Sequence, residues 1–286
     1  MFRELYSFFT HYRQAFSLLN KYNASSIGTM SGVNQLKREV PIVVSLSSDE
    51  ESFDELELTL YSIFNQKVLP DRVIIWLSDE LQLSELPYFI TRFIKNGLEI
   101  RFVKDIKSYT KVIYALKEYK NAIIVLADNN IYYPKDWLKK LYHSYIANPE
   151  DIHAHSVVKI NVNNKNLSLS KSGTQFINEE NASFLYVPIS SGGILYPPSC
   201  FVKDIFRDDI YLKKTDTPWD IWSWVIGTLS GRKLRIVKSH IKTMSCNKIF
   251  KQLKRELYLI KNVQNIDKNI QKLMEYYGQN IYSKIL

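Results

Sequence analysis

A short cluster of acidic and amide side chains, Asp128-Asn129-Asn130, directly follows an apolar run at residues 123–127. The run predicts a buried strand, which would leave the cluster at the carboxyl end of that strand. Oxygen ligands suit hard divalent cations such as Mg²⁺ and Mn²⁺, and a cation held by Asp128 and Asn130 could bridge a diphosphate. Because Asp and Asn also favour turns and helix N-caps, a purely structural role is the alternative.

A second carboxylate with possible chemistry is Asp220, which lies between Trp219 and Trp222 at the start of a predicted helix. Transfer of a group to a hydroxyl with inversion needs a carboxylate that accepts the hydroxyl proton, and Asp220 is the candidate for this base. The same position would suit an N-cap that binds free helix amides. The two tryptophans could stack on the apolar faces of sugar rings, or they could pack in the core.

A third group of residues could bind phosphate. Ser108, Tyr109 and Lys111 open a predicted helix at 108–119, immediately after a predicted strand. The N-terminus of a helix attracts phosphate through its free amides and its dipole, and Lys111 adds a mobile cation. A solvated surface lysine would fit the same pattern.

These residues are expected to be positioned by a repeating alternation of short apolar runs and helical stretches. Continuous apolar strands separated by helices of this length indicate βαβ units and a parallel sheet covered on both faces, so the fold class is α/β. In such sheets, ligands bind beyond the carboxyl ends of the strands. The predicted strands are at 41–46, 71–77, 98–103 and 122–127, and the predicted helices are at 53–65, 84–96, 108–119 and 135–147.

The rest of the chain divides into a mixed second half and two helical extensions. A helix is expected at about 220–229 and a strand at 233–237, and the last forty residues carry apolar stripes against a lysine-rich face. The expected domains are a helical extension with a linker at 1–39, a core domain at 40–246 and a basic helical extension at 247–286. Because the character of the sequence changes after residue 150, the core domain would divide into one half at 40–150 and another at 151–246.

The net charge of +9 is concentrated at the two ends of the chain. Residues 1–39 carry +3 and residues 247–286 carry +5, which leaves only +1 for the body between them. A nucleic-acid enzyme would need basic charge around its central cleft, so a nucleic-acid partner is disfavoured and an anionic membrane surface fits better. The terminal stripes fit packing on the core as well as membrane docking.

Several features favour a protein that is not exported. The N-terminus lacks the basic segment and long apolar stretch of a secretory signal, and no apolar run approaches the roughly 20 residues that cross a bilayer. Cys200 and Cys246 have no disulfide or zinc-site spacing. The expected location is cytoplasmic, with peripheral contact at the inner face of the cell membrane. No feature of the sequence indicates an oligomeric state.

Between residues 41 and 245, the chain resembles the nucleotide-diphospho-sugar glycosyltransferases of the GT-A fold, in particular a bacterial group that makes polysaccharide and lipopolysaccharide. The resemblance implies a hexosyltransferase that moves a sugar from a nucleotide donor, typically UDP-linked, to a glycan or lipid-linked glycan of the bacterial surface or capsule. The matching segments are 43–47, 58–66, 69–77, 105–111, 128–138, 192–198 and 220–222.

The same resemblance implies that 40–150 is a nucleotide-binding half and 151–246 an acceptor half, and it assigns roles to residues. It implies that the donor nucleotide is bound by the ends of the first strands and the Asp128 cluster, that glycines let the backbone approach the donor sugar, and that His240 is a late metal ligand beside Asp128 and Asn130. His153 and His155 alternate on a predicted strand and are expected to be core or surface residues. The implied donor site comprises Ser45, Ser47, Asp79, Asp105, Ser108, Tyr109, Lys111, Asp128, Asn129, Asn130, Gly192 and Gly193, with Asp220 as the base and Trp219 and Trp222 toward the acceptor.

The chain departs from the family pattern at two places. Relatives carry a run of aspartates where this chain has Asn129-Asn130, and amide oxygens bring no charge to offset a cation, so weaker Mn²⁺ or Mg²⁺ binding is expected. Lys111, Arg235 or Lys238 could neutralise the diphosphate instead. Trp219 also replaces the first acid of an Asp-Asp-Ile-Trp motif.

Two alternatives follow from these departures and from the fold. One is a catalytically weakened protein that binds glycans or nucleotides. The other is a sugar-nucleotide pyrophosphorylase, which is less consistent with the sequence because the loop after the first strand, at residues 44–49, has neither glycine nor lysine.

Overall fold

A computed structural model describes residues 32–163, 166–169, 181–214, 217–237, 244–245 and 250–285. Four parallel strands form one half of its main sheet, in the order β3-β2-β1-β4. They are β1 (Ile42–Ser47), β2 (Arg72–Ser78), β3 (Leu98–Val103) and β4 (Ile123–Leu126). The predicted parallel α/β sheet is therefore confirmed, with strand bounds within one residue of the prediction.

The sheet continues past β4 with strands from the second half of the chain. β11 (Ile194–Tyr196) is antiparallel to β4, and β6 (Ile152–Ala154), β12 (Leu234–Ile236) and β9 (Ala182–Ser183) follow in that order. Within the described residues this makes an eight-stranded, mixed sheet. A mostly parallel sheet with this mixed extension and flanking helices is a GT-A-like architecture, as the resemblance implies.

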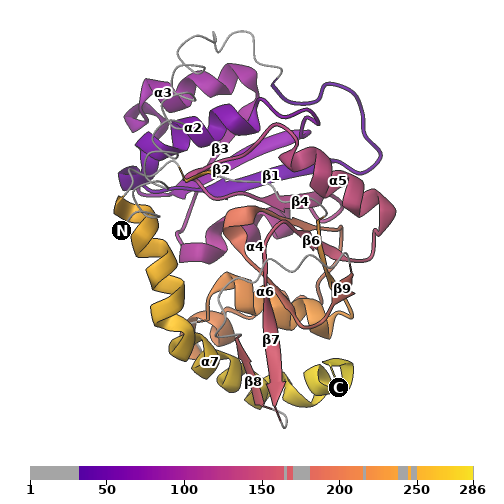
Figure 1. Ribbon diagram of the computed structural model, residues 1–286. Coiled ribbons are helices and arrows are strands. Elements are labelled where there is room, and N and C mark those ends of the chain that lie inside the picture. The colour runs from indigo at the N-terminus through magenta and orange to yellow at the C-terminus, as the bar shows by residue number, and fades with distance from the viewer. Residues whose placement is uncertain are drawn as a thin grey trace, which may run out of the picture.

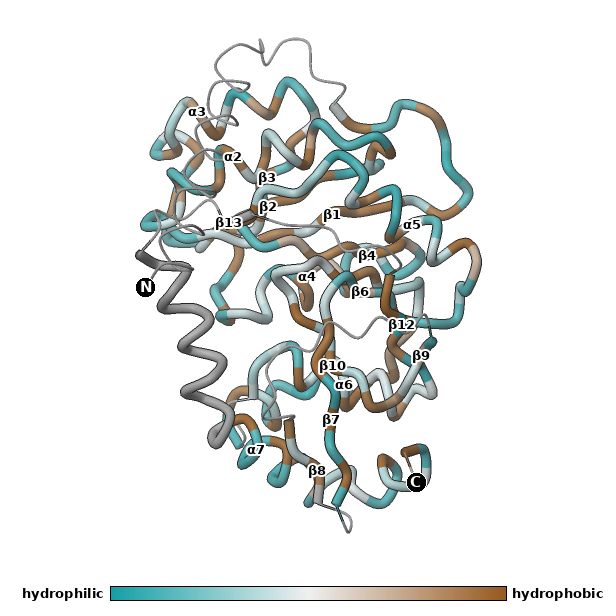
Figure 2. The backbone as a smooth tube through the Cα atoms, viewed as in Figure 1, coloured by the Kyte–Doolittle hydropathy of each residue, from teal (hydrophilic) through white to brown (hydrophobic). Residues whose placement is uncertain are grey.

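Helices cover both faces of the sheet because its strands alternate apolar side chains between the two faces. In β1, the Val43 side chain lies on the face of the sheet that α4 (Thr110–Glu118) and α6 (Trp219–Leu229) cover. The Val44 side chain lies on the opposite face. That opposite face is covered by α2 (Phe53–Ile63) and α5 (Trp137–Ala147). Figure 1 shows the resulting layers, and Figure 2 shows apolar residues gathered in the central strands.

Smaller sheets complete the structure. An antiparallel sheet has the order β10-β7-β8 and lies toward the end of the molecule farthest from α2 and α3 (Figure 1). A two-stranded ribbon pairs the segment after Asp128 with a late segment of the chain. The strands are β7 (Val157–Asn163), β8 (Asn166–Leu169), β10 (Tyr186–Pro188), β5 (Ile131–Tyr132) and β13 (Met244–Ser245).

The predicted single helix at 84–96 is wrong. The segment contains a 3-10 turn at Leu83–Glu85, the four-residue helix α3 (Tyr88–Thr91) and a second 3-10 stretch at Arg92–Asn96. Pro87 explains the break, because a proline disfavours helical geometry in the residue before it, and Leu86 is extended. The other long helices occur where they are predicted, with ends that shift by one or two residues.

The C-terminal extension forms the long helix α7 (Phe250–Ile285). In the part whose side chains are described, the apolar stripe faces inward, with Ile266, Ile270 and Leu273 buried in the same core cluster as α6. The backbone amide of Leu169 also donates to the Asp267 carboxylate at 2.8 Å. Packing on the core is therefore the role of this part of the stripe. The N-terminal helix predicted at 1–22 lies outside the described residues.

Across the described ranges, no helix combines the length and the apolar character that crossing a membrane requires.

Candidate active site

The end of β4 carries a buried ion pair. The Lys111 ammonium donates to the Asp128 carboxylate and, at 3.2 Å, to the backbone carbonyl of Ala127. Both charged side chains are about nine-tenths buried, with 9% and 10% of their surfaces exposed. The Asp128 amide donates to the Tyr133 hydroxyl at 2.8 Å, which fixes the backbone at this point. The sequence predicts both residues at this strand edge, but it does not predict that they pair.

Lys111 reaches the end of β4 because its own backbone is anchored to β1. The Ser45 hydroxyl donates to the Lys111 carbonyl and accepts from the Trp76 indole at 2.8 Å. Ser45 is fully buried, so it holds α4 against the sheet and has no open surface for a nucleotide. Ser45 thus has a positioning role in this structure, and its predicted nucleotide contact stays a prediction. A serine within a strand gives the same sequence signal in either role.

Asp220 lies in the first turn of α6, directly after Pro218 and Trp219. Its carboxylate makes no capping bond to the helix and instead accepts from the Ser190 hydroxyl and, at 3.4 Å, from the Ser190 amide. Proline before a first helical turn is favourable, since no amide donor is lost there. The N-cap alternative is thus not the arrangement found, and Asp220 points across to the loop before β11.

The pKa of Asp220 is raised to about 6. Desolvation by the surrounding protein is the main cause, and the hydrogen bond from Ser190 opposes it. The negative charge of Asp128 raises the pKa further, whereas Lys111 lowers it. Asp220, Asp128 and Lys111 therefore lie close enough for their charges to interact. A carboxylate that titrates near neutral pH is suited to general-base chemistry.

A chain of aromatic and glycine contacts links the two carboxylates. Tyr133, which binds the Asp128 amide, packs on Trp137 with ring centroids 4.2 Å apart. The Trp137 indole donates to the Gly192 carbonyl at 2.9 Å, two residues from Ser190. Hence the loop that holds Asp220 is braced against the turn that holds Asp128. Tyr133 and Trp137 lie in the matching segment 128–138 but have no predicted role of their own, and Ser190 lies in a Ser-Ser-Gly-Gly loop with no catalytic signature.

Gly193 is required by the close approach of Trp137. Its φ is +91°, and an added Cβ would lie 2.4 Å from the indole nitrogen. At Gly192, an added Cβ would lie 2.7 Å from the Ser156 hydroxyl. Both glycines thus serve contacts within the protein, and their predicted role beside a donor sugar stays a prediction.

Substitution of Gly193 should destabilise the fold. We expect Gly193→Ala to lower the free energy of unfolding by about 1–3 kcal/mol, because the new methyl group clashes with a buried ring and the backbone is left-handed. Gly231→Ala is the matched control, since Gly231 has a φ of +75° but an added Cβ would meet only the Lys284 ammonium at 3.7 Å. Urea denaturation of both variants measures the difference. Equal losses would show that the clash with Trp137 contributes nothing.

Several predicted donor residues lie beyond the carboxyl ends of β1, β2 and β3. Ser47 is half-buried, and Asp79, Asp105 and Ser108 are exposed. Burial raises the pKa of Tyr114, and the charges of Asp79 and Asp105 raise it further, so both aspartates lie near the Tyr114 side chain. Asp105 also binds the Lys107 amide at 2.9 Å and the Thr110 hydroxyl at 2.8 Å. The structure brings these residues to one edge, and nucleotide contact by them stays a prediction.

The two asparagines of the cluster differ in their contacts. The Asn129 amide donates to the Ser48 hydroxyl at 2.9 Å, and its backbone carbonyl accepts from Thr59 at 2.9 Å. These bonds tie the loop after β4 to the loop after β1 and to α2. Asn130 is half-buried beside them. The loop is thus held close to the ends of the neighbouring strands.

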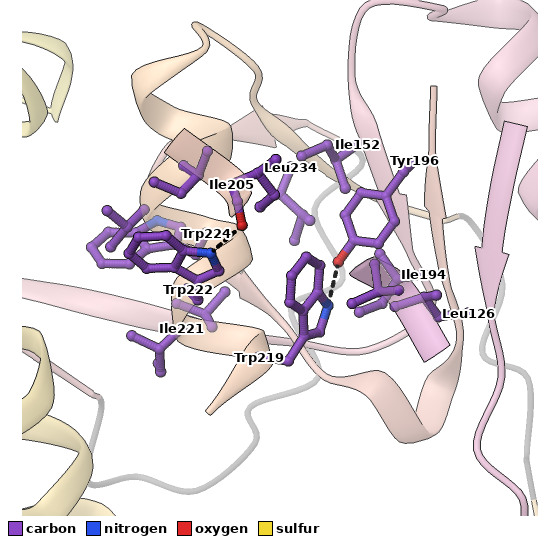
Figure 3. Close-up of a cluster of buried hydrophobic side chains, with 14 of the residues drawn as sticks. Leu126, Ile152, Ile194, Tyr196, Ile205, Trp219, Ile221, Trp222, Trp224 and Leu234 are labelled. Atoms are coloured by element: carbon purple, nitrogen blue, oxygen red, sulfur yellow. Dashed lines mark hydrogen bonds between the residues drawn. The ribbon is translucent and has the colours of Figure 1, made fainter. Parts of the chain in front are cut away.

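Three aromatic residues with predicted substrate contacts are buried in the core of this structure. Tyr109 stacks on Tyr211 with centroids 4.0 Å apart, and its hydroxyl donates to the Thr217 carbonyl. The Trp219 indole donates to the Tyr196 hydroxyl at 3.1 Å, and the Trp222 indole donates to the Ile205 carbonyl at 3.1 Å (Figure 3). All three are buried, which leaves no ring face open to a sugar or nucleotide. Their contacts in this structure are packing contacts at the start of α4 and within α6, and substrate contact by them stays a prediction.

The histidines of the predicted pair are core residues. His153 hydrogen-bonds the Ser144 hydroxyl at 2.8 Å and the Asn148 carbonyl at 3.1 Å, and His155 hydrogen-bonds the Trp137 carbonyl at 3.1 Å. Desolvation lowers the pKa of each to about 4, so both are neutral at physiological pH. Of the two environments expected for this pair, core or surface, the structure confirms the core.

Of the three predicted auxiliary cations, Lys111 lies at the end of β4. Arg235 lies on β12, and its guanidinium donates to the Asp151 carboxylate at 2.8 Å. Lys238 and His240 lie outside the described residues.

No family model matches this sequence, and no curated protein matches it. Its fold is similar to that of a mannosyltransferase, PcManGT from Pyrobaculum calidifontis, whose structure was determined in complex with GDP-Man and Mn²⁺. The alignment covers 99% of this chain and 81% of that chain, with a TM-score of 0.52 and 12% sequence identity. At this identity, the likeness establishes a shared GT-A-like glycosyltransferase fold.

The residues at the end of β4 do not fit a divalent cation well. Among the residues that the structure describes, no group of three His, Cys, Asp or Glu side chains could hold a metal ion. More directly, the only carboxylate of the Asp128 cluster already binds an ammonium group. A doubly charged ion at Asp128 would have to displace Lys111 or lie against it, with repulsion between like charges.

Proposed function

We propose that this protein is a glycosyltransferase that uses a nucleotide-diphosphate sugar. The observation that carries the proposal is the convergence of Asp220, Asp128 and Lys111 at the carboxyl edge of a GT-A-like sheet, where their charges act on one another. A cation there can face a diphosphate, and a carboxylate with a pKa of about 6 can accept a proton. The similarity in fold to a mannosyltransferase supports the same class of reaction.

In the proposed reaction, an acceptor hydroxyl oxygen attacks the anomeric carbon of the donor sugar. The new carbon–oxygen bond forms as the bond from that carbon to the diphosphate oxygen breaks, and the leaving diphosphate keeps the electron pair. The hydroxyl proton passes to the Asp220 carboxylate. Ser190 orients that carboxylate through its hydroxyl and its amide. Displacement from the face opposite the leaving group inverts the anomeric configuration.

The finer parts of the proposal concern substrates and location. The sequence segments that resemble bacterial polysaccharide enzymes support a UDP-linked hexose donor and a surface-glycan or lipid-linked acceptor. The C-terminal segment with its charge of +5 supports contact with an anionic membrane surface from the cytoplasm. On α7, Lys268 and Lys272 are exposed while the apolar stripe is buried, which is consistent with electrostatic contact.

A panel of UDP-, GDP- and dTDP-linked sugars tests this function. We expect release of the nucleoside diphosphate from one of these donors, slowly with water and faster when a glycan acceptor is added. The assay is run with chelator and with added Mn²⁺ or Mg²⁺. Melting shifts without turnover would favour the alternative of a binding protein on this fold. The absence of both turnover and melting shifts would contradict the proposal.

A further inference from the structure

The Lys111–Asp128 ion pair stands at the end of β4, where the sequence pattern predicts a divalent cation. We infer that Lys111 takes the place of that cation and binds the donor diphosphate directly, with Asp128 as the residue that positions it. This inference rests on the proposed glycosyltransferase function, and it specifies a metal-independent form of donor binding. Three sets of observations carry it.

The first is the constraint on Lys111 itself. Its backbone is fixed by the buried Ser45 hydroxyl, and its ammonium donates to Asp128 and to the Ala127 carbonyl. A lysine on the protein surface would have its ammonium group in solvent. In Lys111, both the backbone carbonyl and the ammonium group are held by hydrogen bonds. An ammonium has three donors, so these two acceptors leave one N–H for a ligand oxygen.

The second is the balance of charge at the end of β4. Asp128 is the only carboxylate of its cluster, and the Asn129 amide is used by Ser48. One carboxylate and amide oxygens give little charge to hold a doubly charged ion, whereas one carboxylate matches one ammonium. The ion pair is therefore complete as it stands.

The third is the location of the pair relative to the proposed base. Lys111 and Asp128 both act on the pKa of Asp220, so the ammonium lies near the reacting centre. Lys111 also belongs to the first turn of α4, where the helix dipole adds partial positive charge. A diphosphate that accepts from Lys111 would place its sugar toward Asp220, and a fixed cation would stabilise the charge that develops on the leaving group.

Binding of UDP, GDP and dTDP in chelator, measured by titration calorimetry on the full chain, tests the inference. We expect one of them to bind without metal, and Lys111→Met to weaken its Kd about 10- to 100-fold, as loss of a charged hydrogen bond requires. Lys120→Met is the matched control, because Lys120 is exposed between α4 and the amino end of β4, and the Kd of this variant should equal that of the wild type. Melting curves check the folding of each variant.

Asp128→Asn tests whether Asp128 positions Lys111 or instead acts as a metal ligand. If Asp128 only positions Lys111, the Asp128→Asn variant frees the ammonium from its competing anion, and nucleotide binding in chelator is retained or becomes tighter. Should Lys111→Met fail to fold because Asp128 is left buried and unpaired, the double variant Lys111→Met/Asp128→Asn removes both charges. We expect it to melt like the wild type and to bind as weakly as Lys111→Met should.

Two results have distinct consequences. Nucleotide binding that requires Mn²⁺ or Mg²⁺ and disappears in Asp128→Asn would overturn the inference, because Asp128 would then be a metal ligand, while the proposed function would stand. Failure of all three nucleotides to bind, with metal or with chelator, would overturn the proposed function and the inference with it.

Discussion

Replacement of Asp220 by asparagine should lower kcat about 100- to 10,000-fold, the usual contribution of a positioned general base. The amide has nearly the same shape and can still accept from Ser190, but it cannot take the hydroxyl proton. The measurement is the initial rate of transfer with the donor identified by the panel. Donor binding should change little, because the base acts on the acceptor hydroxyl.

Two controls distinguish loss of the base from loss of the fold. Asp208→Asn changes an exposed carboxylate directly before the π-helix at Asp209–Lys214 and should keep full activity. The melting temperature of Asp220→Asn at neutral pH should equal or exceed that of the wild type, since burial disfavours the charged carboxylate. Wild-type activity in Asp220→Asn would remove Asp220 from the mechanism.

The parallel half of the sheet was predictable because its strands are buried on both faces. Such strands read as unbroken apolar runs, and residues 123–126 are a clear example. The segment at 84–96 was misread because its apolar spacing suits a helix, while the local effect of Pro87 overrides that spacing. In the short strands of the second half, pairing depends on distant partners. The antiparallel insertion of β11 beside β4 therefore has no local signal.

The site was predictable as a set of positions but not as a set of contacts. Asp128, Lys111 and Asp220 follow strands or open helices, and the topology brings such positions to one edge. The ion pair depends on side-chain conformations of residues far apart in the chain. Aromatic residues such as Tyr109 and Trp222 carry the same sequence signal whether they stack on a ligand or pack in a core, and burial decides between these roles.

The activity should also fall on acidification, with a limb in kcat/KM near pH 6, the pKa to which Asp220 is raised. Protonated Asp220 cannot accept the hydroxyl proton, so the rate should drop about tenfold per pH unit below the limb and level off above it. The histidines His153 and His155 titrate near pH 4 and do not account for this limb. Nor does the donor, because both ends of its diphosphate are esterified.

The same pKa fixes the sign of the effect on stability. Because the folded-state value lies above the ordinary value of 3.8, Asp220 stabilises the fold when protonated, and that contribution is lost as the pH rises through about 6. Melting temperatures of the wild type and Asp220→Asn should therefore diverge between pH 4 and pH 7, with the variant relatively more stable at the upper end. Curves that stay parallel would show that Asp220 is not the group that titrates.

Ser190→Ala provides the test of how the base is positioned. The Ser190 hydroxyl donates to the ionised carboxylate and lowers its pKa, so its removal should move the limb of kcat/KM to higher pH. At pH 8, above the shifted limb, much of the activity should return, since the Ser190 amide still contacts Asp220. A uniform loss of rate at every pH would instead mean that Ser190 serves only the local structure. If the limb in kcat/KM shifts when the Ser190 hydrogen bond is removed, the group that titrates in the limb is the one that Ser190 contacts. That shift would identify Asp220 as the base that Ser190 positions.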